Sequence, residues 1–118
     1  MITKKQPHWY TLNMLPLYVE MCDNTLNITI SDLTLLQDKL LKPHLLNNVV
    51  IQNIYNIYHA QKDDNWMYFE QCKKWRDENP NDDELRLIAL IEKNASQIDV
   101  INHQIVTLTK SIKCSEID

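Results

Sequence analysis

Glycine is absent from this chain of 118 residues. Its average usage is about 7%, and β-sheet proteins depend on it for hairpin turns and bulges. The lack of glycine therefore argues against a sheet and predicts an all-α fold, although a codon bias toward asparagine and isoleucine would leave the same deficit. Asparagine tolerates the left-handed conformation better than most residues. We expect Asn47, Asn48, Asn79 and Asn81 to replace glycine at helix ends.

Long basic runs and long apolar runs are missing as well. The formal net charge is −4 and no basic cluster exceeds Lys4-Lys5 or Lys73-Lys74, so nucleic acid is not an expected partner. The longest apolar run, residues 87–91, is far shorter than the roughly 20 residues needed to cross a bilayer. No apolar signal-peptide region follows the first lysines. If the chain is complete, these features predict a cytoplasmic protein without a membrane partner.

The chain contains only three cysteines, and they are far apart in the sequence. Cys22, Cys72 and Cys114 form no CxxC motif and are odd in number, which argues against a disulfide framework. We expect reduced thiols. In the fold predicted below, Cys22 and Cys72 fall within about one helical turn of each other, where they are expected to pack as small hydrophobic groups. The alternative is a disulfide or a thiol site.

Apolar residues recur at heptad spacing in three segments, which is typical of long amphipathic helices. The helices are expected at about 13–41, 48–78 and 82–112. Pro43 ends the first segment and Pro80 lies in the polar stretch after the second, since proline disfavours helical continuation. At the start of the first helix, Asn13 and Pro16 are expected as N-cap and first-turn proline.

The two connections are short, and short connections make sequential helices antiparallel neighbours. The length and the 44% hydrophobic content suit one folded domain with one core. We therefore predict a single domain over residues 1–118. Its architecture is expected to be an antiparallel up-down-up bundle of three long helices, which dimerisation would complete.

Each predicted helix turns polar near its middle. Counting residues outward from the two turns places Thr29, Gln61, Asn65 and Asn102 at about one height. One interpretation is a buried hydrogen-bonded layer that fixes helix register. A second is a water-filled or ligand-holding gap. A third is that Gln61 and Asn65 simply face solvent.

The first helix carries a second apolar stripe outside its heptad seam. Met14, Met21, Ile28 and Leu35 repeat at intervals of seven residues. Three helices do not necessarily cover both stripes. The stripe is therefore either part of a wide buried face or a surface that docks a helix of a second copy or another protein.

One group of residues has metal-ligand chemistry. His59 and Asp63 share a face of the second helix, as Asp99 and His103 share a face of the third. The same counting brings the two pairs to similar heights, so four nitrogen and oxygen ligands suited to zinc or iron could meet. None lies on a heptad seam, however, and solvated helix pairs explain the pattern more simply.

No spacing in the chain indicates a catalytic or cofactor motif. We therefore expect a small non-enzymatic protein of bacterial type, acting as an adaptor or assembly subunit. It would self-associate, most simply as a dimer, through the stripe on its first helix and need no cofactor. The alternative function is a metal- or small-ligand-binding bundle that uses the His59, Asp63, Asp99 and His103 cluster.

Overall fold

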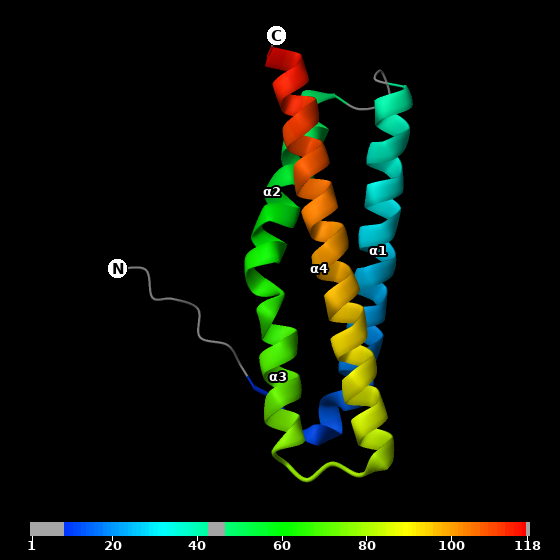
Figure 1. Ribbon diagram of the computed structural model, residues 1–118, viewed down its shortest axis with the longest axis vertical. Coiled ribbons are helices and arrows are strands. Elements are labelled where there is room, and N and C mark those ends of the chain that lie inside the picture. Colours follow the sequence, from blue (N-terminus) through cyan, green and yellow to red (C-terminus); the bar gives the residue numbers. More distant parts are fainter. Residues whose placement is uncertain (1–8, 43–46, 118) are drawn as a thin grey trace, which may run out of the picture.

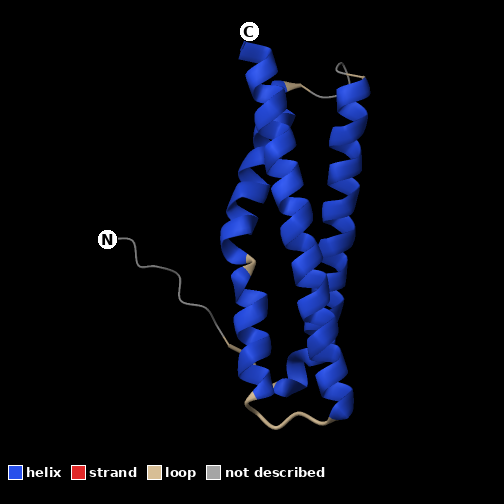
Figure 2. Ribbon diagram, viewed as in Figure 1, coloured by secondary structure: helices blue, strands red, loops and turns tan. Residues whose placement is uncertain are grey.

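The computed structural model describes residues 9–42 and 47–117 and is built from helices (Figure 1). The side chains of residue 40 and of residues from 113 onward lie outside the described part, as do the predicted helix end at Pro43 and the thiol of Cys114. Within these ranges no strand occurs (Figure 2), which confirms the all-α prediction. The elements in chain order are η1 (Leu12–Met14), α1 (Leu15–Leu41), α2 (Asn48–Asp64), α3 (Trp66–Arg76) and α4 (Asp82–Ile117).

The start of α1 differs from the prediction that Asn13 is its N-cap. The preceding residues form the 3-10 turn η1, in which Met14 N donates to Thr11 O over 3.0 Å. Asn13 lies inside η1, and its Oδ1 accepts from the Thr11 hydroxyl. Met14 is the N-cap instead, and Pro16 occupies the first turn, where a missing N–H costs nothing.

The expectation of one helix over residues 48–78 is wrong, because α2 ends at Asp64 and α3 begins at Trp66. Asn65 lies between them, and its carbonyl accepts from Tyr68 N over 3.2 Å in a tightened 3-10-type link. The Asn65 side chain bonds to α4. Asparagine and aspartate compete with helical hydrogen bonding through their own side chains, so the sequence Asp63-Asp64-Asn65 is a natural place for the interruption.

Of the four asparagines expected to replace glycine at helix ends, only Asn79 does so within the described residues, and Asn48 is the first residue of α2. Asn79 has a positive φ of 55° at the turn between α3 and α4, which confirms that it takes a position usual for glycine. Asn47 and Asn81 are N-caps instead, since their Oδ1 atoms accept from Val50 N at 2.9 Å and Glu84 N at 2.8 Å. Glu84 returns a bond to Asn81 N, forming a capping box.

The last helix is the centre of the packing. α4 continues to Ile117, beyond the end predicted at residue 112, and lies against α1, α2 and α3 (Figure 1). The closest backbone contacts between helices are made by α4. α1 reaches α2 through the Tyr58 hydroxyl, which donates to Asp32, and reaches α3 through aromatic side chains. The side of α1 that faces α2 and α3 is therefore more open than the side against α4.

The core consists of two apolar clusters. The proximal core, near the start of α1, contains Leu15, Cys22, Leu26, Cys72, Trp75, Ile88, Ile91, Ala95 and Ile98. The distal core contains Leu36, Ile51, Ile54, Tyr58, Ile105, Val106 and Ile112. Buried polar residues lie between the two clusters on each part of the bundle. They are Thr29 in α1, Asn65 between α2 and α3, and Asn102 in α4.

Candidate functional site

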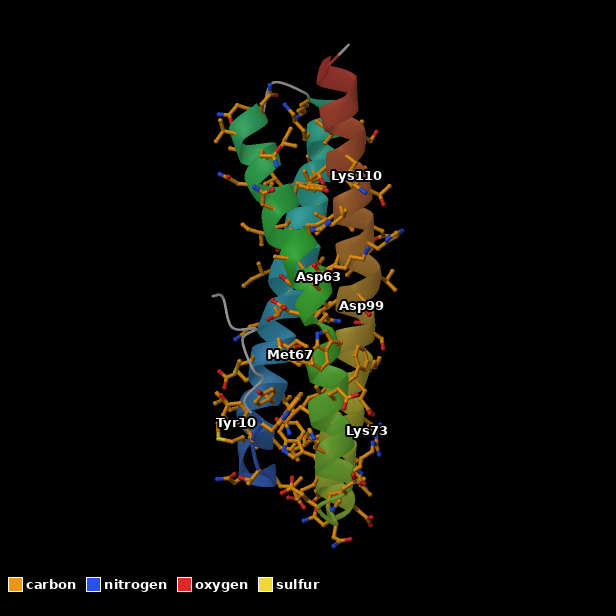
Figure 3. The ribbon with its side chains drawn as sticks, turned by 90° about the vertical axis from the view of Figure 1, so that its left-hand side faces the viewer. Tyr10, Asp63, Met67, Lys73, Asp99 and Lys110 are labelled. Atoms are coloured by element: carbon orange, nitrogen blue, oxygen red, sulfur yellow. The ribbon has the colours of Figure 1, made fainter. Side chains whose placement is uncertain are left out.

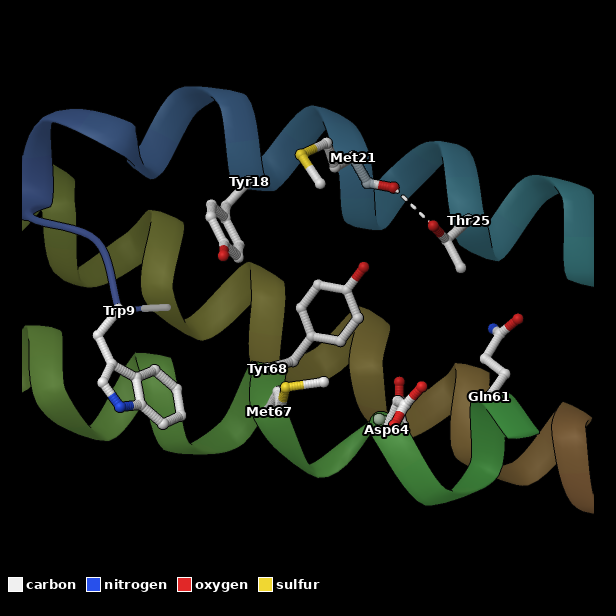
Figure 4. Close-up of a pocket in the computed structure, with 9 residues that line it drawn as sticks. Trp9, Tyr18, Met21, Thr25, Gln61, Asp64, Met67 and Tyr68 are labelled. Carbon is white, nitrogen blue, oxygen red and sulfur yellow. Dashed lines mark hydrogen bonds between the residues drawn. The ribbon is translucent and has the colours of Figure 1, made fainter. Parts of the chain in front are cut away.

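A pocket of about 330 Å³ opens where α1 faces the junction of α2 and α3 (Figure 4). One end is apolar and the other polar, as the close-up shows. Its walls come from four segments of the chain. The lining residues are Trp9, Tyr18, Met21, Thr25, Gln61, Asp64, Asn65, Met67 and Tyr68.

The N-terminal segment closes the apolar end because α3 holds its backbone. Gln71, which is buried, accepts from Tyr10 N at 2.8 Å and donates to Tyr10 O at 3.1 Å. Trp75 Nε1 donates to the same carbonyl at 2.9 Å. These bonds place Trp9 at the pocket wall, where its ring lies edge-on to Trp66 at 6.3 Å between centroids. Lys74 Nζ lies 5.1 Å from the centre of the Trp9 ring, a cation–π distance.

Tyrosine rings span the gap between α1 and α3. The Tyr18 ring lies 5.1 Å from Trp75 and 6.4 Å from Tyr68, in edge-to-face arrangements that aromatic pairs favour. Burial raises the pKa of Tyr18 and of Tyr68, so both phenols stay protonated at neutral pH. The aromatic wall is therefore uncharged.

The polar end of the pocket contains amide groups with unmet hydrogen-bonding capacity. Asn65 is 2% exposed, and its Nδ2 donates to Ala95 O at 3.0 Å and Asp99 Oδ1 at 2.9 Å. Both partners are acceptors, so the amide orientation is determined and Oδ1 points elsewhere. Asn65 Oδ1 and Gln61 Nε2 are buried without a hydrogen-bond partner. Such atoms cost free energy unless something fills the site.

The structure places the four predicted polar-layer residues between the two apolar clusters. Thr29 is buried and its hydroxyl donates to Thr25 O at 2.7 Å. Asn102 is 0% exposed, and neither of its side-chain polar atoms has a partner. Among the described residues, all four unpaired buried side-chain atoms belong to Gln61, Asn65 and Asn102. Only Gln61 and Asn65 line the pocket.

The apolar stripe of α1 is only partly covered. Met14 is half-buried and packs against the proximal core. Met21, Ile28 and Leu35 are 46%, 62% and 41% exposed. Met21 also lines the pocket.

The predicted His/Asp cluster does not form a metal site. Asp63 and Asp99 lie at similar heights on neighbouring helices (Figure 3), but His59, Asp63, Asp99 and His103 are all exposed. Asp99 is bonded to Asn65, and the His59 ring lies 5.4 Å from that of Tyr55. In the part of the chain described, no three His, Cys, Asp or Glu side chains are placed to hold a metal ion. The four predicted ligands lie off the heptad seams, so their side chains point outward and do not converge.

Cys22 and Cys72 are free, fully buried thiols in the proximal core. Each points at a carbonyl of α4, Ile91 O and Ile88 O respectively, at 3.8 Å. Burial, with a smaller effect of Asp23, raises the pKa of Cys22 to about 11. Burial likewise raises the pKa of Cys72 to about 12. Protonated, inaccessible thiols of this kind pack as small hydrophobic side chains and are poor nucleophiles.

Asp64 and Met67 were not predicted as site residues, because they flank a helix interruption that heptad counting missed. Trp9 is held at the wall by the hydrogen bonds of the neighbouring Tyr10 backbone. The described helices include none with the length and apolar content to traverse a membrane. No protein-family model, characterised protein or solved structure shows a significant match to the chain.

Proposed function

We propose that this chain is a small cytoplasmic, non-enzymatic assembly protein that self-associates through the exposed stripe of α1, defined by Met21, Ile28 and Leu35. The observation that supports this proposal is the exposure of all three side chains on one helix face. Contiguous exposed apolar surface on a small protein is typical of interaction sites. Buried reduced thiols fit the cytoplasm, where disulfides are rare.

The charge distribution favours a second copy as the occupant. From Asn24 to Ser31 the sequence of α1 contains no charged residue. In a two-fold antiparallel pairing, Ile28 meets its own copy at the axis while Met21 meets Leu35 of the other copy. Such an isologous contact satisfies both copies with the same residues. The uncharged centre keeps like charges away from the axis, while Asp23 and Asp32 lie toward the ends of the contact.

The arrangement within each copy would be the up-down-up bundle that the short connections favour. α4 covers one side of α1, and the second copy would cover the stripe. Six partly exposed apolar side chains would be buried per dimer, each contributing on the order of 1 kcal/mol. Association itself costs at least about 4 kcal/mol. The difference of about 2 kcal/mol corresponds to a Kd on the order of 10 mM, so we expect a weak dimer that is populated only at millimolar concentrations and above.

The test compares two substitutions of exposed apolar residues. Ile28→Glu places a charge at the proposed axis, whereas Val100→Glu, at a site 60% exposed on α4, is the matched control. We expect the native chain and Val100→Glu to gain mass with concentration in light scattering or sedimentation, and Ile28→Glu to stay monomeric. Equal masses for all three chains at every concentration would contradict self-association through this stripe.

Engineered thiols can test the antiparallel geometry. In a Cys114→Ser background, Ile28→Cys is expected to form a disulfide dimer with itself under mild oxidation. Met21→Cys alone is expected to cross-link poorly, whereas a mixture of Met21→Cys and Leu35→Cys chains should form the heterodimer. Efficient self-linkage of Met21→Cys would indicate a parallel pairing instead.

A further inference from the structure

We infer that the pocket between α1 and the α2–α3 junction binds a small aromatic ammonium compound, with its ring among the tyrosines and its cation at Asp64. A volume of about 330 Å³ lies at the lower end of the range for small-molecule sites. The lining residues belong to one copy of the chain, and Met21 is the one that the pocket shares with the stripe of α1.

The apolar end of the pocket suits a flat ring. Trp9, Tyr18 and Tyr68 supply aromatic surface, and Met21 and Met67 supply thioether groups that adapt to ring edges (Figure 4). The Trp9 wall is held by the bonds from Gln71 and Trp75 to Tyr10, so part of the site is preorganised. An apolar ligand body would displace water from these side chains.

The polar end selects for a cationic donor. Asp64 contributes an exposed carboxylate that lines this end of the pocket. An ammonium group carries three donors and can pair with this carboxylate. Cations are also attracted to the faces of tyrosine rings.

The same features exclude anions of equal size. A carboxylate in place of the ammonium would meet the Asp64 carboxylate with like charge. Phenethylamine and 3-phenylpropionate share a phenylethyl body and differ in the charged group. With about nine non-hydrogen atoms, phenethylamine is expected to bind with a Kd on the order of 1 mM or below.

The experiment titrates each compound into the full chain and follows amide resonances by NMR. We expect phenethylamine to give saturable shifts of the Gln61 and Asn65 side-chain amides and of Tyr68, and 3-phenylpropionate to give none. Asp64→Asn is expected to weaken binding about fivefold, because the lost ion pair is solvent-exposed. Asp63→Asn removes the neighbouring exposed carboxylate outside the pocket and is expected to leave the Kd unchanged.

Several outcomes would overturn the inference. Equal binding of the two compounds would show that the site does not select a cation, and equal losses for Asp63→Asn and Asp64→Asn would indicate general electrostatics. Absence of saturable shifts up to about 10 mM, an affinity too weak for a built site of this size, would reject the site itself. Ile28→Glu should retain phenethylamine binding, so a failure of the proposed dimer and a failure of the pocket remain distinguishable.

Discussion

Asn102 illustrates what a single buried polar residue does in this bundle. It lies on the central helix between the two apolar clusters, fully buried, and both its side-chain polar atoms are unpaired. Asn65 occupies the same region but donates to two acceptors on α4. Desolvating an amide without a partner is unfavourable, whereas a paired amide stabilises the fold. The two asparagines should therefore respond oppositely to the same substitution.

We expect Asn102→Leu to raise the free energy of unfolding by about 1 kcal/mol, since it removes two unpaired polar atoms. Asn65→Leu should lower it by about 1–2 kcal/mol, because it leaves Ala95 O and Asp99 without their donor. Urea denaturation of both variants measures the two free energies of unfolding and checks these predictions. A loss of stability in Asn102→Leu would mean that its amide is satisfied by bound water.

At the scale of elements, the helix ends depend on asparagine because glycine is absent. The turn between α3 and α4 needs one residue with positive φ, and Asn79 supplies it. A residue with a Cβ pays a steric cost in this conformation, which glycine avoids and asparagine partly offsets. The turn is therefore a site where glycine would be tolerated.

Asn79→Ala is expected to lower the free energy of unfolding by about 1 kcal/mol, whereas Asn79→Gly should leave it equal or higher. Thermal unfolding followed by circular dichroism distinguishes the two. The same substitutions at Asn53, an exposed position within α2, provide the control. There alanine should be the better residue, because glycine weakens helix interiors. An identical ranking at both positions would contradict the role assigned to Asn79.

Heptad spacing was sufficient to predict the helices of the described ranges but not the interruption at Asn65. The apolar positions of residues 48–78 keep their register across the break, so periodicity alone could not reveal it. The polar stretch Asp63-Asp64-Asn65 was the available signal. The pocket was predicted only in part, since a ligand-holding gap near Gln61 and Asn65 was one interpretation of the polar layer. The position of Trp9 depends on backbone hydrogen bonds from Tyr10 to α3, which helix periodicity does not reveal. The His/Asp pairs failed for the opposite reason, since spacing along two helices does not determine which way the side chains point.

At the scale of the whole molecule, several buried acids have pKa values shifted in one direction. Burial raises the pKa of Cys22 to about 11 and that of Cys72 to about 12. Burial also raises the pKa of Tyr18 and Tyr68, and burial with the hydrogen bond to Asp32 raises that of Tyr58. In the unfolded chain these groups ionise at lower pH. The free energy of unfolding is therefore highest at pH values where these groups are protonated in the unfolded chain as well.

The sign of the resulting pH dependence follows from linkage. The contribution of the two thiols is fully present below about pH 9, the ordinary value, and is lost as pH rises toward 11 and 12. We expect urea midpoints to fall steadily between about pH 8 and pH 11. Cys72→Val should make the decrease shallower, because one titrating group is removed. A midpoint constant over this range would show that the thiols are not buried in solution.

The bonds between Tyr10 and α3 join positions separated by 61 and 65 residues. A chain that begins at Thr11 lacks the Tyr10 carbonyl that accepts from Trp75 Nε1. It also lacks both hydrogen-bond partners of the buried Gln71 amide. A chain truncated in this way is therefore expected to be less stable where α3 packs. Tyr10 belongs to the folded unit although it precedes the first helix.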